Sequence, residues 1–212
     1  MLVSGCLLLL DVAVTRLWQE PLSALMAARE QGALADDLTA RAQQFDTTVS
    51  AGRQEGVADA RRARAEPAGV RARAYAERLD AGGAVGRIMF PTLGDSFVFA
   101  EGTDAATLRK APGHYPGSGL PGVRRPVAIA GHRTTYGAPF GELDDLQPGD
   151  RIEIEMPYGR FVYRVREQRI VDPDAVWVTE RGTDRLVLTT CHPPFSAAQR
   201  LVIFADLVPE DG

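Results

Sequence analysis

The chain has 212 residues and a formal net charge of −4, with 45% hydrophobic and 25% charged residues. This composition is typical of a globular protein with one domain of ordinary size and an additional segment. It excludes the strongly basic surface that nucleic-acid binding requires, and two cysteines are too few for a disulfide framework.

Residues 1–20 are mostly apolar and predict a membrane anchor. The run from Leu2 to Val14 is shorter than the roughly 20 residues that a spanning helix needs, and Asp11 and Arg16 interrupt its extension. No basic segment precedes the run and no clear cleavage site follows it. Three interpretations remain: an anchor whose start has been lost, an uncleaved signal-anchor, or an amphipathic helix. We expect an anchor; an apolar helix packed on the domain is the alternative.

Residues 21–83 are rich in Ala, Arg, Glu and Gln and predict a helical stalk. Leu34 and Leu38 belong to a series of apolar residues with helical spacing. Pro67 breaks this region, so two or three helical pieces are expected. Gly82-Gly83 marks the boundary with the next domain.

Residues 84–212 contain short apolar runs separated by Gly and Pro turn signals, which predict strands. The predicted strands are 85–90, 96–101, 126–130, 151–156, 160–170, 175–178, 186–190 and 201–207. A short helix is expected at 104–110 with Thr103 or Asp104 as its N-cap, and 111–125 predicts a loop. Many short strands with little helix favour a mainly β domain, either a closed barrel or a sandwich.

Cys191 stands at the end of an apolar strand, and Arg200 follows nine residues later at the start of another. The only other cysteine, Cys6, lies in the apolar N-terminus. A thiolate is a nucleophile, and a guanidinium beside it can stabilise an oxyanion. The alternative for Cys191 is an inert buried thiol.

A cysteine nucleophile needs a base, and the chain has three histidines. His132 follows an apolar strand and opens a loop, which favours it. His114 lies in a Gly- and Pro-rich segment and is its rival. His192 adjoins Cys191, so on a strand its side chain would point to the opposite face. Asp144 and Asp145 predict a solvated turn, and we expect neither a metal nor another cofactor.

The segment Val187-Leu188-Thr189-Thr190-Cys191 resembles the signature Thr-Leu-x-Thr-Cys of the sortase family, with Arg200 as the arginine that follows it. Val187 stands where the family usually has threonine. The segment 131–140, Gly-His-Arg-Thr-Thr-Tyr-Gly-Ala-Pro-Phe, resembles the histidine motif of actinobacterial class E sortases, and 111–116 is also similar to a segment of that class. The resemblance covers about residues 84–208.

The resemblance implies an eight-stranded sortase-type β-barrel with short helices, preceded by the membrane anchor and helical stalk. It implies Cys191 as nucleophile, His132 as general acid and base, and Arg200 as oxyanion or substrate clamp. The residues for which it implies a place near the substrate are Tyr136, Thr190, His114 and Trp177. Trp177 lies where sortases build the substrate groove, although packing in the core is its alternative role.

The implied activity is that of a cysteine transpeptidase. It would cleave a C-terminal sorting signal of the Leu-Ala-x-Thr-Gly or Leu-Pro-x-Thr-Gly type between Thr and Gly, through a thioacyl-enzyme. It would join the surface protein to the amine of a peptidoglycan precursor of the lipid II type. The expected location is the membrane of a Gram-positive bacterium, with the catalytic domain on the extracytoplasmic face. The alternatives are a thiol hydrolase of the same fold and a non-catalytic β domain that binds the cell wall.

Overall fold

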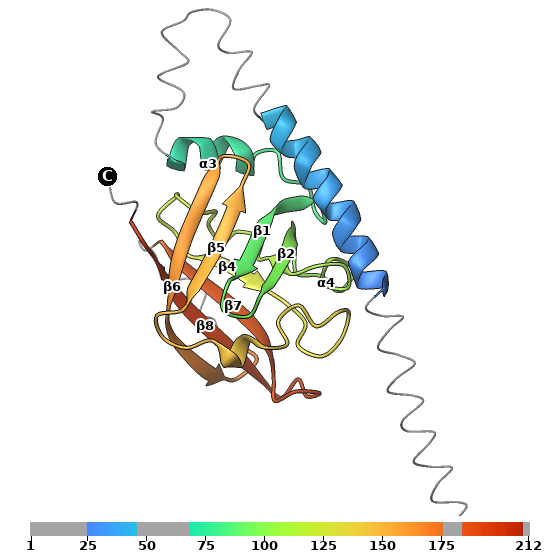
Figure 1. Cartoon of the computed structure of the whole chain (residues 1–212), viewed down its shortest axis with the longest axis vertical. Helices are drawn as coiled ribbons and strands as arrows, with labels where there is room; N and C mark the ends of the chain where they lie inside the picture. The colour runs from blue at the N-terminus through green and yellow to red at the C-terminus, as the bar shows by residue number, and fades with distance from the viewer. Residues whose placement is uncertain (1–24, 46–67, 176–183, 210–212) are drawn as a thin grey trace, which may run out of the picture.

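The computed structural model describes residues 25–45, 68–175 and 184–209. A helix covers 25–45. The elements that follow it are α3 (Ala68–Ala76), β1 (Ala84–Phe90), β2 (Asp95–Glu101), α4 (Ala105–Leu108), β3 (Gly113–His114), β4 (Val127–Ala130), the 3₁₀ helix η1 (Leu143–Asp145), β5 (Arg151–Met156), β6 (Gly159–Val171), β7 (Arg185–His192) and β8 (Gln199–Leu207) (Figure 1).

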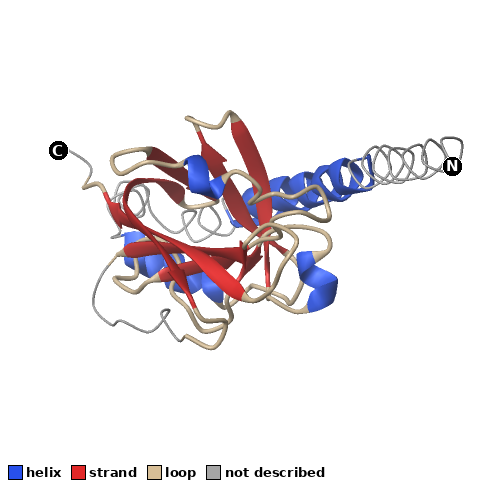
Figure 2. Cartoon of the chain, turned by 90° about the horizontal axis from the view of Figure 1, so that it is seen from below, coloured by secondary structure: helices blue, strands red, loops and turns tan. Residues whose placement is uncertain are grey.

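The strands of the described residues close into a barrel in the order β1-β2-β3-β4-β7-β8-β6-β5. Figure 2 shows the strands and the helices around them in a second view. Strand β5 pairs with β1, which closes the barrel. The pairs β2–β3 and β4–β7 are parallel, and the other pairs are antiparallel. This architecture confirms the predicted mainly β fold with an eight-stranded barrel and short helices.

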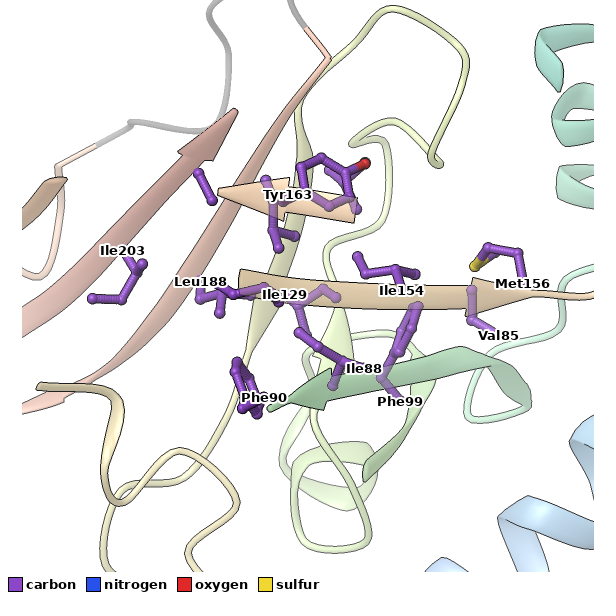
Figure 3. Close-up of a cluster of buried hydrophobic side chains, with 14 of the residues drawn as sticks. Val85, Ile88, Phe90, Phe99, Ile129, Ile154, Met156, Tyr163, Leu188 and Ile203 are labelled. Atoms are coloured by element: carbon purple, nitrogen blue, oxygen red, sulfur yellow. The ribbon is translucent and has the colours of Figure 1, made fainter. Parts of the chain in front are cut away.

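The interior of the barrel is filled by large apolar side chains from strands on all sides. Ile88, Ile129, Leu188 and Ile203 come from four different strands, and all have 0% exposure (Figure 3). Burial of this apolar surface is the main force that favours the fold. A second, smaller apolar cluster contains Ala128, Val187, Val202 and Phe204. These residues alternate along β4, β7 and β8 with the interior residues, so they lie on the outer face of the barrel.

The helix at 25–45 lies along β1 and β2 (Figure 1). The side-chain amide of Gln31 donates to the Val98 carbonyl oxygen at 3.0 Å and accepts from the Val98 N–H at 2.8 Å. One turn and a half further along, the Asp37 carboxylate accepts from the Ala84 N–H at 2.9 Å. Leu34 completes the contact, because it is buried in a cluster with Ala84 and Val98.

Helix α3 and the end of the 25–45 helix contribute to the main core of the barrel. Phe45, Ala72 and Tyr75 are buried in the same cluster as the interior strand residues. The Tyr75 hydroxyl donates to the Val85 carbonyl oxygen at 3.0 Å. In the described parts of the region predicted as a stalk, 21–83, two helices therefore pack against the barrel.

The local predictions differ from the structure at few places. Seven of the predicted strands correspond to β1, β2, β4, β5, β6, β7 and β8. Asp104 is the N-cap of α4, since its carboxylate accepts from the N–H groups of Ala106 and Thr107. Strand β3 lies inside the segment 111–125, so the loop prediction was wrong at these two residues. Two residues are too few to show an alternating pattern.

Two predictions concern residues outside the described ranges. Residues 176–178 of the predicted strand 175–178 lie outside them, and Ala175 is not in a strand. The predicted anchor, 1–20, also lies outside them. None of the described helices is both long enough and apolar enough to cross a membrane.

Candidate active site

Strands β7 and β8 place Cys191 and Arg200 opposite each other. The two residues are antiparallel register partners. Directly paired residues on an antiparallel ladder have Cα atoms about 5 Å apart and side chains on the same face. The chain reverses direction between these two residues. A spacing of nine residues in the sequence therefore brings Arg200 back opposite Cys191.

The parallel pairing of β4 with β7 brings His132 to the same row. The register pairs Ala130 with Thr189, and the Gly131 N–H continues the ladder by donating to the Thr189 carbonyl oxygen at 3.0 Å. Continued two residues further along both chains, this register brings His132 level with Cys191. The three residues predicted to act together thus come from three neighbouring segments at one end of the β4-β7-β8 sheet.

The row lies on the outer face of the barrel. Cys191 alternates with Thr190 along β7, and Leu188, which shares the phase of Thr190, points into the core. Thr190 is buried, and its hydroxyl donates to the Gly131 carbonyl oxygen at 2.8 Å. This bond ties the strand of the nucleophile to the segment before His132. Cys191 itself is partly exposed and carries a free thiol.

Gly131 allows the His132 loop to lie close to the core. A Cβ at this position would lie 2.5 Å from the Phe140 ring, which is closer than carbon atoms can approach. The Phe140 N–H donates to the His132 carbonyl oxygen at 3.0 Å and closes the loop. The backbone of His132 is therefore fixed by packing and hydrogen bonding on both sides.

The environment of His132 disfavours a second proton on its ring. Burial lowers the pKa of the imidazole below its usual range, and the positive charge of Arg109 lowers it further. The Tyr136 ring packs against His132 with a centroid distance of 4.9 Å. Tyr136 is 42% exposed, so it forms an outer wall beside the imidazole.

Arg200 makes contacts within its own turn. Its Nη1 donates to the carbonyl oxygens of Ala197 at 3.0 Å and Gln199 at 2.9 Å. These bonds hold the guanidinium at the start of β8, and the register pairs the backbone of Arg200 with that of Cys191.

The other two histidines have different surroundings. His114 is buried on β3, with Nδ1 2.7 Å from a Glu101 carboxylate oxygen and Nε2 2.9 Å from the Gly119 carbonyl oxygen. Its ring therefore has polar neighbours on both sides. His192 has Nδ1 2.8 Å from Nη1 of Arg133. Neither of these two takes the place beside Cys191 that the strand register gives to His132.

Trp177, predicted near the substrate, lies outside the described residues. Arg109, whose charge acts on His132, and Arg133, which contacts Cys191 and His192, were not singled out from the sequence. The position of Arg133 directly after His132 was the feature of the sequence that could have indicated a role at the site. Among the described residues, no group of three or more His, Cys, Asp or Glu side chains is arranged to hold a metal ion.

The comparisons with known proteins agree with this geometry. The sortase domain family model matches residues 88–208. Sortase D of Bacillus subtilis (strain 168) is 33% identical over 135 residues, which cover 61% of this chain and 66% of that protein. Sortase SrtE1 of Streptomyces coelicolor is 33% identical over 129 residues, which cover 52% of this chain and 36% of that protein.

The structure of a Clostridium perfringens Sortase D5 transpeptidase is similar to this fold, with a TM-score of 0.59 and 26% identity. The similarity covers 65% of this chain and 86% of that one. The fold and the site define a β-barrel with a cysteine, a histidine and an arginine on one row. The chain belongs to the sortase family, a family of cysteine transpeptidases. The similarity to SrtE1 supports the class E resemblance of its histidine motif.

Proposed function

We propose that this chain is a cysteine transpeptidase that cleaves a sorting signal of the Leu-Ala-x-Thr-Gly or Leu-Pro-x-Thr-Gly type between Thr and Gly. The supporting observation is the row formed by Cys191, Arg200 and the segment that ends at His132. A thiol, a base and a fixed cation on one face are the groups that acyl transfer requires.

The first half of the reaction forms a thioacyl-enzyme. His132 takes the proton of the Cys191 thiol, and the resulting thiolate attacks the carbonyl carbon of the substrate threonine to form a C–S bond. The Arg200 guanidinium stabilises the negative charge on the carbonyl oxygen. The Thr–Gly C–N bond then breaks, and the leaving glycine amine takes a proton from the His132 imidazolium.

The second half transfers the acyl group to an amine. His132 removes a proton from the amine of a peptidoglycan precursor of the lipid II type. The nitrogen attacks the thioester, an amide C–N bond forms, and the C–S bond breaks to release the Cys191 thiolate, which takes the proton back from His132. No cofactor is needed, because the thiol, the imidazole and the guanidinium supply each step.

The proposal includes the contacts around the substrate. The exposed Tyr136 ring, packed on His132, is suited to contact the residue before x in the signal. The proposed contacts of Thr190, His114 and Trp177 rest on the family resemblance. We also place the chain in the cell membrane through residues 1–20, with the barrel on the extracytoplasmic face, where surface proteins and wall precursors meet.

A cleavage assay with an added amine tests the function. The peptide carries Leu-Ala-x-Thr-Gly between a fluorophore and a quencher, a second peptide carries Leu-Pro-x-Thr-Gly, and triglycine is the acceptor. We expect cleavage between Thr and Gly and an amide product with triglycine by mass spectrometry. Cys191→Ala should lose at least about 10³-fold in kcat/KM because it removes the nucleophile. Cys6→Ala, which changes the other cysteine, is the matched control.

Each alternative predicts a different outcome. Cleavage with only the free threonine acid as product, at any triglycine concentration, would identify a hydrolase. A wild-type chain that cleaves neither peptide, and whose Cys191 alkylates no faster than a thiol in a denatured-state reference, would identify a non-catalytic domain. Full activity of Cys191→Ala would refute the proposed mechanism, provided that its circular dichroism spectrum matches that of the wild type.

A further inference from the structure

The side chain of Arg133 joins three separate segments around the candidate active site. Nη1 lies 2.8 Å from Nδ1 of His192 and 3.5 Å from the Cys191 carbonyl oxygen, and Nη2 lies 2.7 Å from an Asp144 carboxylate oxygen. Arg133 itself follows His132 in the loop after β4. One guanidinium therefore contacts Cys191, His192 and Asp144 of η1. It belongs to the residue that directly follows His132.

The direction of these bonds follows from the chemistry of the guanidinium. Arginine has N–H donors only and stays protonated. In the contact with His192, Nδ1 is therefore the acceptor. Asp144 neutralises the charge from the opposite side through a charge-assisted bond. The geometry fixes both the orientation of the His192 ring and the backbone at Cys191.

Stability alone does not account for Arg133. Its side chain is 3% exposed, and its Nε is buried without a hydrogen-bond partner among the described residues. Burying a cation with an unsatisfied donor is unfavourable, and apolar replacements of such groups are often neutral or stabilising. Asp144, at 48% exposure, would remain solvated if the arginine were removed.

We propose that Arg133 is a positioning residue that holds the end of β7 against the His132 loop, so that the thiol of Cys191 and the imidazole of His132 stay in register. This inference rests on the proposed transpeptidase function. The parallel pairing of β4 with β7 ends at Ala130 and Thr189. The Arg133 contacts restrain Cys191 and His192, which lie beyond the paired residues. A misplacement of about 1 Å between reacting groups can reduce the rate by about 10²-fold.

The test compares kcat, KM and thermal unfolding for Arg133→Met, Arg133→Lys and the wild type in the peptide assay. We expect Arg133→Met to lower kcat by about 10- to 100-fold, with KM changed less than about threefold and the unfolding midpoint retained. Arg133→Lys keeps the charge and one donor and should recover part of kcat. Arg160→Met, which removes an exposed arginine 3.5 Å from Glu153, is the matched control.

Variants of His192 test the same contact from the other side and leave the buried cation in place. His192→Asn retains an acceptor near the position of Nδ1 and should keep most of kcat, whereas His192→Ala should lower kcat as Arg133→Met does. The double variant Arg133→Met/His192→Ala should lose no more than the larger single loss, because both changes break one contact. The comparison of His192→Asn with His192→Ala keeps the proposal testable even if Arg133→Met does not fold.

Three results would overturn the inference. They are a wild-type kcat in folded Arg133→Met, a loss of kcat that only follows a lower unfolding midpoint, and equal activities of His192→Asn and His192→Ala. In each of these cases the wild type still transfers the acyl group, so the proposed function stands. A wild type that neither cleaves nor transfers would refute the proposed function, and the positioning role with it.

Discussion

At the scale of single residues, His132 shows how the surroundings set the chemistry of one side chain. Its imidazole is partly buried, is subject to the positive charge of Arg109, and packs on one side against Tyr136. Each of the first two effects favours the neutral ring. A neutral imidazole is the form that accepts a proton from Cys191, so the surroundings prepare His132 for its first step as a base.

Arg109→Gln is expected to raise the pKa of His132, because it removes a positive charge that opposes protonation. The His132 Hε1 resonance, followed by NMR as a function of pH, measures the shift directly. Lys110→Gln removes the adjacent positive charge and is the control, since the charge that acts on this imidazole is that of Arg109. An unchanged His132 titration in Arg109→Gln would contradict the proposed electrostatic effect.

The lowered pKa of His132 also makes the stability of the folded chain depend on pH. The folded pKa is below the usual 6.5 of the unfolded chain, so the unfolded chain binds the proton first as the pH falls. The stabilising contribution is therefore complete above pH 6.5 and is lost as the pH falls through the folded pKa. Arg109→Gln should narrow the pH range between the unfolded and folded pKa values of His132, over which stability is lost. The unfolding temperature, measured as a function of pH, would show this change.

At the scale of elements, the 25–45 helix serves as a partial substitute for a strand. Strand β3 pairs with only Ala100 and Glu101 of β2, which leaves Val98 beyond the paired range. Gln31 supplies both a donor and an acceptor to the backbone of Val98, as a neighbouring strand would. The edge of β2 is thereby covered, and an uncovered edge is a site for unwanted pairing.

Gln31→Ala should lower the free energy of unfolding by about 1–3 kcal/mol, because it leaves the N–H and C=O of a buried residue without these partners. Chemical denaturation followed by circular dichroism measures the change. Gly32→Ala, one residue away, should instead stabilise the helix by about 0.5–1 kcal/mol, since a Cβ there meets nothing within 4 Å. Equal stabilities of Gln31→Ala and the wild type would show that the amide contacts do not contribute.

The elements also show which features a sequence can predict. The strands with apolar runs, such as β7 with Leu186 and Leu188, were predicted because buried residues recur in a local pattern. Strand β3 was missed because its pairing depends on Gly113, where a Cβ would overlap the Gly102 carbonyl oxygen. Close approach of that kind depends on Gly102, which follows β2, and no local pattern around Gly113 indicates it.

The candidate site was predictable to the extent that its residues carry a motif. Cys191, His132 and Arg200 end or begin apolar strands, and the family signature names their roles. Arg133 was missed because its burial and its contacts with His192 and Asp144 arise only when β4, β7 and η1 come together. The sequence around Asp144 predicted a solvated turn, and the ion pair with Arg133 is the finding that modifies this interpretation.

At the scale of the whole molecule, the helices before the barrel share its core. The ring of Phe45 meets that of Tyr75 edge-on at a centroid distance of 5.6 Å, and both side chains are buried in the main cluster. The surroundings raise the pKa of Tyr75 to about 12, mainly through burial. The helical pattern of 21–83 predicted the helices but contained no information on what they contact.

The shared core predicts that stability depends on residues far from the matched family region, 88–208. Phe45→Ala should lower the free energy of unfolding by about 3–5 kcal/mol, since it leaves a cavity between the 25–45 helix and Tyr75. Leu25→Ala, on the same helix but 67% exposed, should change it by less than about 0.5 kcal/mol. Both values are obtained from denaturant unfolding of the otherwise unchanged chain. A Phe45→Ala variant as stable as Leu25→Ala would mean that the helix contributes nothing to the core. The barrel would then be the whole stability unit, and the helix would be a separate stalk.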